Sequence, residues 1–145
     1  MAHRILPFYN IDAAVGPHRS NKLEDTMLVQ FFMKEIFDFK APITVGHAFP
    51  SQPLTVNGTA DQNTFDWIMA FQKCFQAFGI GVVTDGVVDT ARAFLTTKSA
   101  LANSVYTIVV FNNIFQAQQP DQFPKLWEHP RMPAALATQL KLFVK

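Results

Sequence analysis

The stretch Leu54-Thr-Val-Asn-Gly-Thr-Ala-Asp-Gln-Asn-Thr-Phe-Asp-Trp-Ile-Met-Ala-Phe-Gln72 decides the fold, because it joins a tight turn directly to a helix. The Asn57-Gly58 pair predicts the turn, since glycine accepts a positive φ and asparagine tolerates one. A second phrase, Val83-Thr-Asp-Gly-Val-Val-Asp89, repeats the turn at Asp85-Gly86. We expect both turns to be structural elements of the fold and not catalytic ones.

Apolar residues at helical spacing predict two long helices, one before the first turn and one after it. The first covers residues 22–39, where Asn21 stands three residues before Glu24 in the arrangement of a capping box. The second begins at residue 62 or 63 and ends at residue 78. The predicted core combines one face of each helix: Val29, Phe32, Ile36, Ile68, Phe71, Phe75 and Phe78.

The segments around these helices are rich in turn-forming residues. Four prolines and glycines in residues 40–53 exclude a long helix there and favour a loop. Residues 79–89 hold two short β-branched pairs, which suit either a tiny hairpin or an extended crossing. A further short helix is predicted over residues 90–97.

The run Val105-Tyr-Thr-Ile-Val-Val-Phe111 favours a strand by propensity, but its pattern continues without a breaker to Pro120, and that length favours a helix over residues 105–118. A short helical turn at 124–128 and a final helix after Pro133 follow. The prediction is therefore a mainly α fold: a compact helical bundle with short turn or hairpin segments. Residues 1–98 form the helical domain with an N-terminal arm, and residues 99–145 form a helical C-terminal extension packed on it.

Composition excludes several classes of function. A net charge of +1 with 16% charged residues gives no basic stripe for nucleic acid. No stretch reaches the roughly 18 apolar residues of a membrane span, and the N-terminus lacks the pattern of a signal peptide. We expect synthesis in the cytoplasm, with release of the protein or assembly into an extracellular or phage-type particle as a further possibility.

The first helix is apolar on two sides. Leu23, Met27 and Phe31 form a stripe apart from its core face. Two explanations stay open: the helix is sandwiched between the core and the C-terminal segment, or the stripe meets another subunit. Phe65 and Met69 lie off the core band of the second helix and are candidates for the same interface or for cover by the proline-rich loop. With 15 phenylalanines in 145 residues, the surplus of apolar surface favours a homo-oligomer.

Residues that could carry chemistry do not form a recognisable site. Cys74 falls in the core band of the second helix, where no base is expected beside it. The histidines are scattered and predicted to be solvated or locally hydrogen-bonded: His3, His18, His47 and His129. The acidic residues are explained by turns and helix starts. We therefore expect no catalytic residue, no cofactor and no metal site.

The order of the turn and helix phrases resembles the peptidoglycan-binding-domain-like family over about Val15 to Ala91. The resemblance rests on these residues: Gly16, Asn21, Asp25, Val29, Gln30, Leu54, Val56, Asn57, Gly58, Thr64, Ile68, Phe71, Gln72, Asp85, Gly86 and Val88. It implies a compact fold with three main helices that binds cell-wall glycopeptide or serves as a scaffold.

Three functions are compatible with this sequence. The first is a non-catalytic structural or adaptor subunit of a bacterial or phage-type particle, with itself or other particle subunits as partners. The second is a cell-wall module that binds peptidoglycan. The third is a small wall-active enzyme, for which no catalytic residues can be named. The missing export signal favours the first over a freely secreted wall binder.

Overall fold

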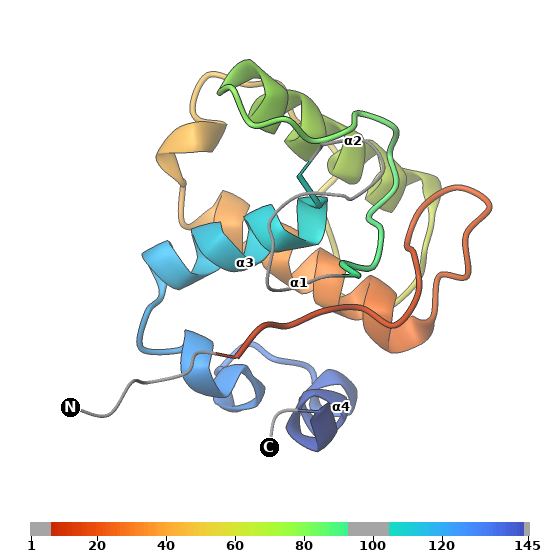
Figure 1. The fold of residues 1–145 in the computed structure, drawn as a ribbon, viewed down its shortest axis with the longest axis vertical. Coiled ribbons are helices and arrows are strands. Elements are labelled where there is room, and N and C mark those ends of the chain that lie inside the picture. Colours follow the sequence, from red (N-terminus) through yellow and green to blue (C-terminus); the bar gives the residue numbers. More distant parts are fainter. Residues whose placement is uncertain (1–6, 93–104, 144–145) are drawn as a thin grey trace.

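The computed structural model describes residues 7–92 and 105–143. Within these ranges the chain is mainly helical, as predicted, and Figure 1 shows how the helices are arranged. The elements in chain order are α1 (Leu23–Asp38), the 3-10 helix η1 (Pro42–Thr44), α2 (Gln62–Ala77), α3 (Thr107–Gln118), the 3-10 helix η2 (Phe123–Glu128) and α4 (Ala134–Phe143).

The first helix begins one residue later than predicted, and the predicted capping box is wrong. Lys22 is the N-cap residue of α1 and makes no side-chain cap hydrogen bond. Asn21 instead adopts a φ of +49°, and its side chain accepts from Gly16 N at 2.8 Å and donates to Gly16 O at 3.0 Å. Its amide closes the preceding loop and is therefore not available to the helix.

The N-terminal arm is tied to the helices by a few buried hydrogen bonds. Asp25, in the first turn of α1, accepts from the backbone N–H groups of Asp12 and Ala13 at 3.0 Å each. Tyr9 N donates to Asn112 Oδ1 on α3 at 2.9 Å. The arm therefore connects the first and third long helices.

The second helix matches its predicted range closely. Asp61 caps it by accepting from Thr64 N at 2.8 Å, which satisfies one of the free N–H groups of the first turn. Six of the seven predicted core residues are buried, but Phe78 is 68% exposed, so its assignment to the core is wrong. The helix ends at Ala77, and Phe78 is its C-cap residue at the edge of the molecule.

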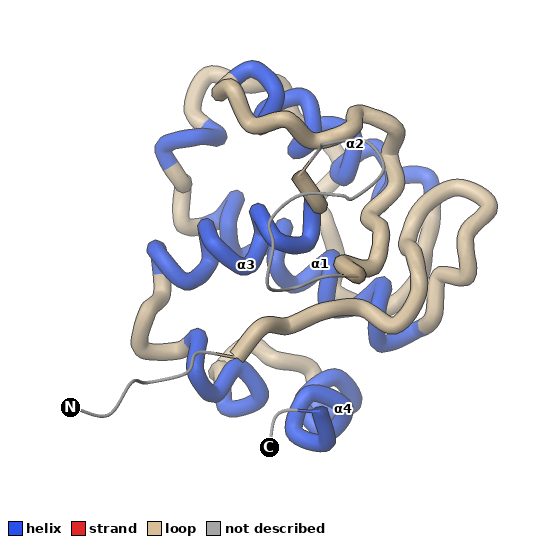
Figure 2. The backbone as a smooth tube through the Cα atoms, viewed as in Figure 1, coloured by secondary structure: helices blue, strands red, loops and turns tan. Residues whose placement is uncertain are grey.

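The length argument for the third helix is confirmed, because α3 is helical in spite of its β-branched residues. Val105 lies before it and forms an isolated parallel bridge to Val82, while Val15 pairs with Val88 in an antiparallel bridge. Residues 79–89 are thus an extended crossing and not a hairpin, and Figure 2 shows them as loop. Of the short helix predicted over residues 90–97, residues 90–92 are not helical and the remainder lies outside the described residues.

α1 is the central element of the fold. It packs against α2, α3 and α4, and in Figure 1 it lies with α3 between α2 at the top and α4 at the bottom. The first of the two open explanations therefore holds: α1 is sandwiched between the core and the C-terminal segment. Since α3 packs mainly on α1, the predicted domain and its extension share one core. The predicted boundary at residues 98 and 99 lies outside the described residues.

Candidate functional site

Each of the two predicted turns is held by a buried glutamine from the helix that precedes it. Gln30 Oε1 accepts from Asn57 N at 3.0 Å and from Gly58 N at 2.8 Å. Gln72 Oε1 accepts from Asp85 N at 3.2 Å and Gly86 N at 2.8 Å. The same glutamine device, a buried side-chain oxygen that accepts from two successive N–H groups of a turn, thus occurs twice in the chain, once on α1 and once on α2.

The amide groups of the two glutamines extend each device to the next helix. Gln30 Nε2 donates to Thr64 Oγ1 on α2 at 3.0 Å, and Gln72 Nε2 donates to Thr107 Oγ1 on α3 at 3.2 Å. Gly58 and Gly86 have φ values of +78° and +75°, in agreement with the turn chemistry predicted for them. These contacts join one helix to the next, and they give the four turn residues a structural explanation.

The role of the glutamines was not predicted from the sequence. Gln72 is a polar residue in the middle of the chain's second long helix, and its side chain is fully buried. One sequence pattern could have indicated this role: an apolar residue and a glutamine in a helix, followed later by an Asn-Gly or Asp-Gly turn, occur twice in the chain. These residues are part of the family resemblance, but the resemblance gave no contact for Gln30 or Gln72.

The five residues predicted to form an interface are not brought together on an open surface. Met27 and Phe31 are buried, so their assignment to an exposed stripe is wrong. Phe31 packs against His129, with ring centroids 5.1 Å apart, which shows that the C-terminal segment covers it. Leu23 remains 51% exposed, and Phe65 and Met69 are half-buried.

Two hollows flank the proline-rich loop. One, of about 220 Å³, has an apolar wall made by Phe37, Pro50, Pro53, Leu54 and Trp67. The other, of about 350 Å³, is lined by Met69 and by loop residues that include Phe49. Met69 therefore lies beside the loop, which was one of the two positions considered for it.

The first hollow combines aromatic rings with a few polar groups. Phe37 and Trp67 pack edge to face at 4.9 Å, and Trp67 Nε1 donates to Gln52 O at 3.0 Å, which fixes the indole. Phe37 is 38% exposed. Lys34 and Asp38, which also line the hollow, form an ion pair at 3.2 Å. Such a mixture of apolar wall and oriented polar groups is typical of small binding sites.

A buried polar cluster lies between α1 and the C-terminal segment. Glu35 accepts two hydrogen bonds from Arg131, each at 2.8 Å, and one from Gln119 Nε2 at 3.0 Å. His129 Nε2 lies 2.8 Å from Gln119 Oε1 and 3.3 Å from Glu35 Oε1. This cluster was not predicted from the sequence. The expectation that the histidines are scattered and solvated or locally hydrogen-bonded is wrong for His129, which is buried.

The surroundings shift the pKa of both titratable groups in this cluster. Burial favours a higher pKa for Glu35, but the hydrogen bonds from Arg131 and Gln119 outweigh burial and leave the pKa below its ordinary value. Burial lowers the pKa of His129, and this effect exceeds the opposing attraction of the Glu35 carboxylate. The cluster is therefore stable with Glu35 ionised and His129 neutral.

Other potentially reactive groups have structural surroundings. Cys74 is buried, as predicted, and its thiol donates to Ile43 O on η1 at 2.6 Å. Burial raises the pKa of this thiol, which disfavours the nucleophilic thiolate. Within residues 7–92 and 105–143, no three His, Cys, Asp or Glu side chains are grouped so as to hold a metal ion.

None of the helices in the described part of the chain combines the length and apolar character needed to cross a membrane. Comparisons with protein-family models, with curated proteins and with solved structures gave no match. The proposals that follow therefore draw on the sequence pattern and on the geometry of the chain itself.

Proposed function

We propose that this protein is a non-catalytic structural or adaptor subunit with a peptidoglycan-binding-like fold, which acts by self-association or by docking in a bacterial or phage-type particle. The observation that carries this proposal is an apolar edge where η1 contacts the end of α2, with Val45 directly after η1 and Phe78 at the C-cap of α2. These residues are 69% and 68% exposed, the largest exposures among the large hydrophobic residues described. Exposed aromatic and aliphatic side chains are anchors of the kind that protein interfaces bury.

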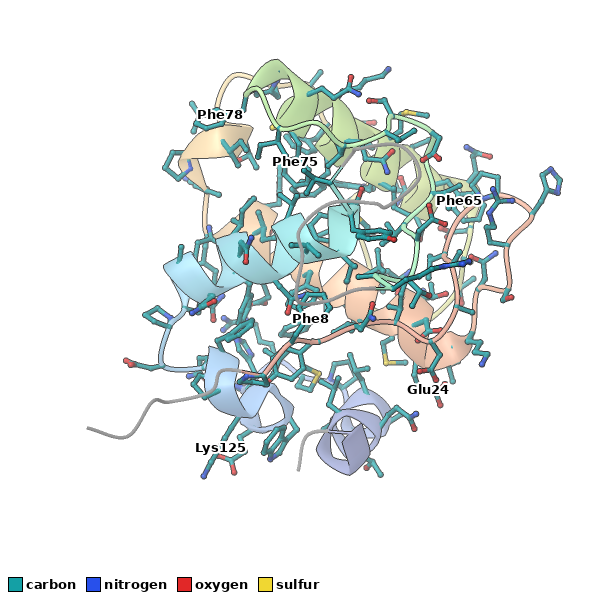
Figure 3. All side chains as sticks on the ribbon, viewed as in Figure 1. Phe8, Glu24, Phe65, Phe75, Phe78 and Lys125 are labelled. Carbon is teal, nitrogen blue, oxygen red and sulfur yellow. The ribbon has the colours of Figure 1, made fainter. Side chains whose placement is uncertain are left out.

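The edge has a fixed geometry. The hydrogen bond from Cys74 to Ile43 holds the end of α2 against η1. Phe78 follows Cys74 by one helical turn, and Val45 comes directly after η1. In Figure 3, Phe78 accordingly lies beside the η1 ribbon. Because its two supports are joined, the edge presents both side chains without the entropic cost of ordering a loop.

We infer that the occupant of this edge is a second copy of the chain or another particle subunit with an apolar surface. Burial of apolar area contributes roughly 25 cal/mol per Å², so a symmetric contact that covers Phe78 on both copies gains from each ring. This edge takes the place of the stripe of Leu23, Met27 and Phe31 as the proposed interface.

Sedimentation velocity and light scattering of the purified protein test this proposal, with electron microscopy to detect larger particles. We expect concentration-dependent association that Phe78→Ser weakens by about tenfold or more, as for the loss of an interface anchor. Leu23→Ser is the matched control, because Leu23 is exposed at the N-terminal end of α1, whereas η1 follows the C-terminal end of that helix. We expect this variant to leave association unchanged. A wild-type protein that is monomeric at all concentrations would contradict self-association.

A second candidate function is the binding of peptidoglycan, which the hollow beside Phe37 and Trp67 favours. Lys34, Asp38 and the hydroxyl of Ser51 line this hollow together with the Phe37 ring. Such a site offers an apolar face and hydrogen bonds to a sugar ring or a short peptide. A pull-down with purified sacculi tests this function. We expect Phe37→Ala to reduce retention and Val83→Ser, at an exposed apolar residue outside the hollow, to preserve it. A strictly monomeric protein that sediments with sacculi would favour wall binding over assembly.

A further inference from the structure

The C-terminal segment is attached to α1 by a polar cluster that contains a buried carboxylate, that of Glu35. Glu35 is almost fully buried on α1, yet its carboxylate forms an ion pair with Arg131. The counter-charge, Arg131, is about half exposed and stands on the loop between η2 and α4. A buried carboxylate of this kind depends on its partners, because loss of one leaves an uncompensated charge in the interior.

The orientation of His129 follows from its hydrogen bonds. Its Nδ1 accepts from Arg131 N at 3.1 Å, so the proton of the neutral ring is on Nε2. Nε2–H then donates to Gln119 Oε1 at 2.8 Å, and Gln119 passes a hydrogen bond on to Glu35. Neutral His129 thus completes a chain of contacts that runs from the C-terminal segment through Gln119, the C-cap residue of α3, to α1.

A proton on Nδ1 cannot be accommodated in this arrangement. It would point at the N–H of Arg131, and the existing acceptor would be lost. The ring is also packed against Phe31 at 5.1 Å and Phe115 at 5.9 Å and is not exposed to solvent, so loss of its acceptor is costly. Protonation therefore favours a state in which the ring leaves this position.

We propose that Glu35, Gln119, His129 and Arg131 form an acid-sensitive latch that holds residues 123–143 against α1 at neutral pH and releases them on acidification. Release uncovers Phe31, which His129 covers in the closed state. In Figure 1, η2 and α4 lie at the opposite end of the molecule from α2, so they can separate while α1, α2 and α3 stay packed. This inference goes beyond the proposed function and does not depend on it.

Burial is the main cause of the lowered pKa of His129, and the charged groups around the ring act in opposite directions. On α1, Glu35 attracts the protonated ring, and Asp38 interacts with Arg131. In the C-terminal segment itself, the charge of Arg131 opposes protonation of His129. The group that faces it from α3, Gln119, does not titrate. Because the pKa of His129 is lowered in the closed state, acid shifts the equilibrium toward the open state as the pH falls below about 6.5. Since the pKa of Glu35 is also lowered, its protonation adds to opening below about 4.5.

Hydrogen–deuterium exchange of the full chain between pH 7 and pH 5 tests the latch. The measured quantity is the protection of peptides from α4 relative to peptides from α2, which corrects for the intrinsic effect of pH on exchange. We expect the relative protection of α4 to fall between pH 7 and pH 5, because acid favours the open state in which His129 is protonated. His129→Gln cannot titrate and should abolish this fall, whereas His47→Gln, at an exposed histidine, should retain it.

Two results would overturn the latch. One is parallel loss of protection in α2 and α4, which would mean that acid unfolds the whole molecule at once. The other is a His129 ring that titrates at or above 6.5 in an NMR titration of the wild-type protein, a measurement that stays valid even if His129→Gln does not fold. An NMR midpoint below 6.5 that coincides with selective loss of α4 protection supports it.

Discussion

At the scale of single residues, the two turn glycines have the same backbone conformation but different surroundings. A Cβ at Gly58 would lie 2.2 Å from Leu23 Cδ1 and 3.1 Å from Leu23 O. At Gly86 the nearest atom would be Met69 Cε at 3.6 Å, an ordinary contact. The left-handed conformation therefore constrains both positions, whereas close packing constrains only Gly58.

We accordingly expect Gly58→Ala to destabilise the protein more than Gly86→Ala. Both variants pay the cost of a positive φ, about 1–2 kcal/mol, and Gly58→Ala also has to displace the Leu23 side chain. Urea unfolding followed by circular dichroism measures the two free energies of unfolding. Equal losses would mean that Leu23, which is half exposed, moves aside without cost.

At the scale of elements, the paired glutamine devices explain why helices separated by long loops keep their positions. Gln72 supplies the acceptor for two backbone N–H groups in the second turn and a donor to Thr107 on α3. An apolar residue at position 72 would leave the buried N–H of Gly86 without a partner, which costs about 1–3 kcal/mol, and would also remove the acceptor of the partly buried N–H of Asp85.

Gln72→Leu should therefore lower the free energy of unfolding by about 2–4 kcal/mol. It should also remove the exchange protection of the Gly86 amide while the Gly58 amide, held by Gln30, stays protected. Gln62→Leu, at an exposed position of the same helix, is the control and should change stability by less than about 0.5 kcal/mol. Amide exchange by NMR reads the two glycines separately, and equal loss at both would contradict independent devices.

The helices and turns were predictable from the sequence because their signals are local. Periodicity identified α1 and α2, the unbroken length of the pattern identified α3, and glycine chemistry identified both turns. Burial of Gln72 was not predictable, since its partners are backbone groups that only the folded chain brings to it. The cluster of Glu35 and Arg131 was also beyond reach, because the two residues are 96 positions apart in the sequence.

At the scale of the whole molecule, the high phenylalanine content is used mainly inside the chain. A continuous series of ring contacts leads from α1 to α2: Phe31 to Phe115 at 5.9 Å, Phe115 to Phe32 at 5.6 Å, Phe32 to Phe111 at 6.4 Å, and Phe111 to Phe71 at 5.6 Å. The series crosses α1, α3 and α2 and forms one aromatic core. The core therefore contains most of the phenylalanine rings that the structure describes. Phe37, Phe39 and Phe78 remain exposed, and Phe78 is the most exposed of the three.

Phe71 and Phe78 allow a matched comparison of a buried and an exposed ring, since Phe71 lies in α2, Phe78 is its C-cap residue, and both were predicted to be core residues. Phe71 is fully buried and contacts Phe49, Phe75 and Phe111, so Phe71→Ala should cost about 3–5 kcal/mol. Phe78→Ala should change the stability of the monomer by less than about 0.5 kcal/mol, because its ring is already in water. Chemical denaturation at low protein concentration measures both without a contribution from association. A cost at Phe78 similar to that at Phe71 would mean that this ring is buried in solution and is not available as an interface anchor.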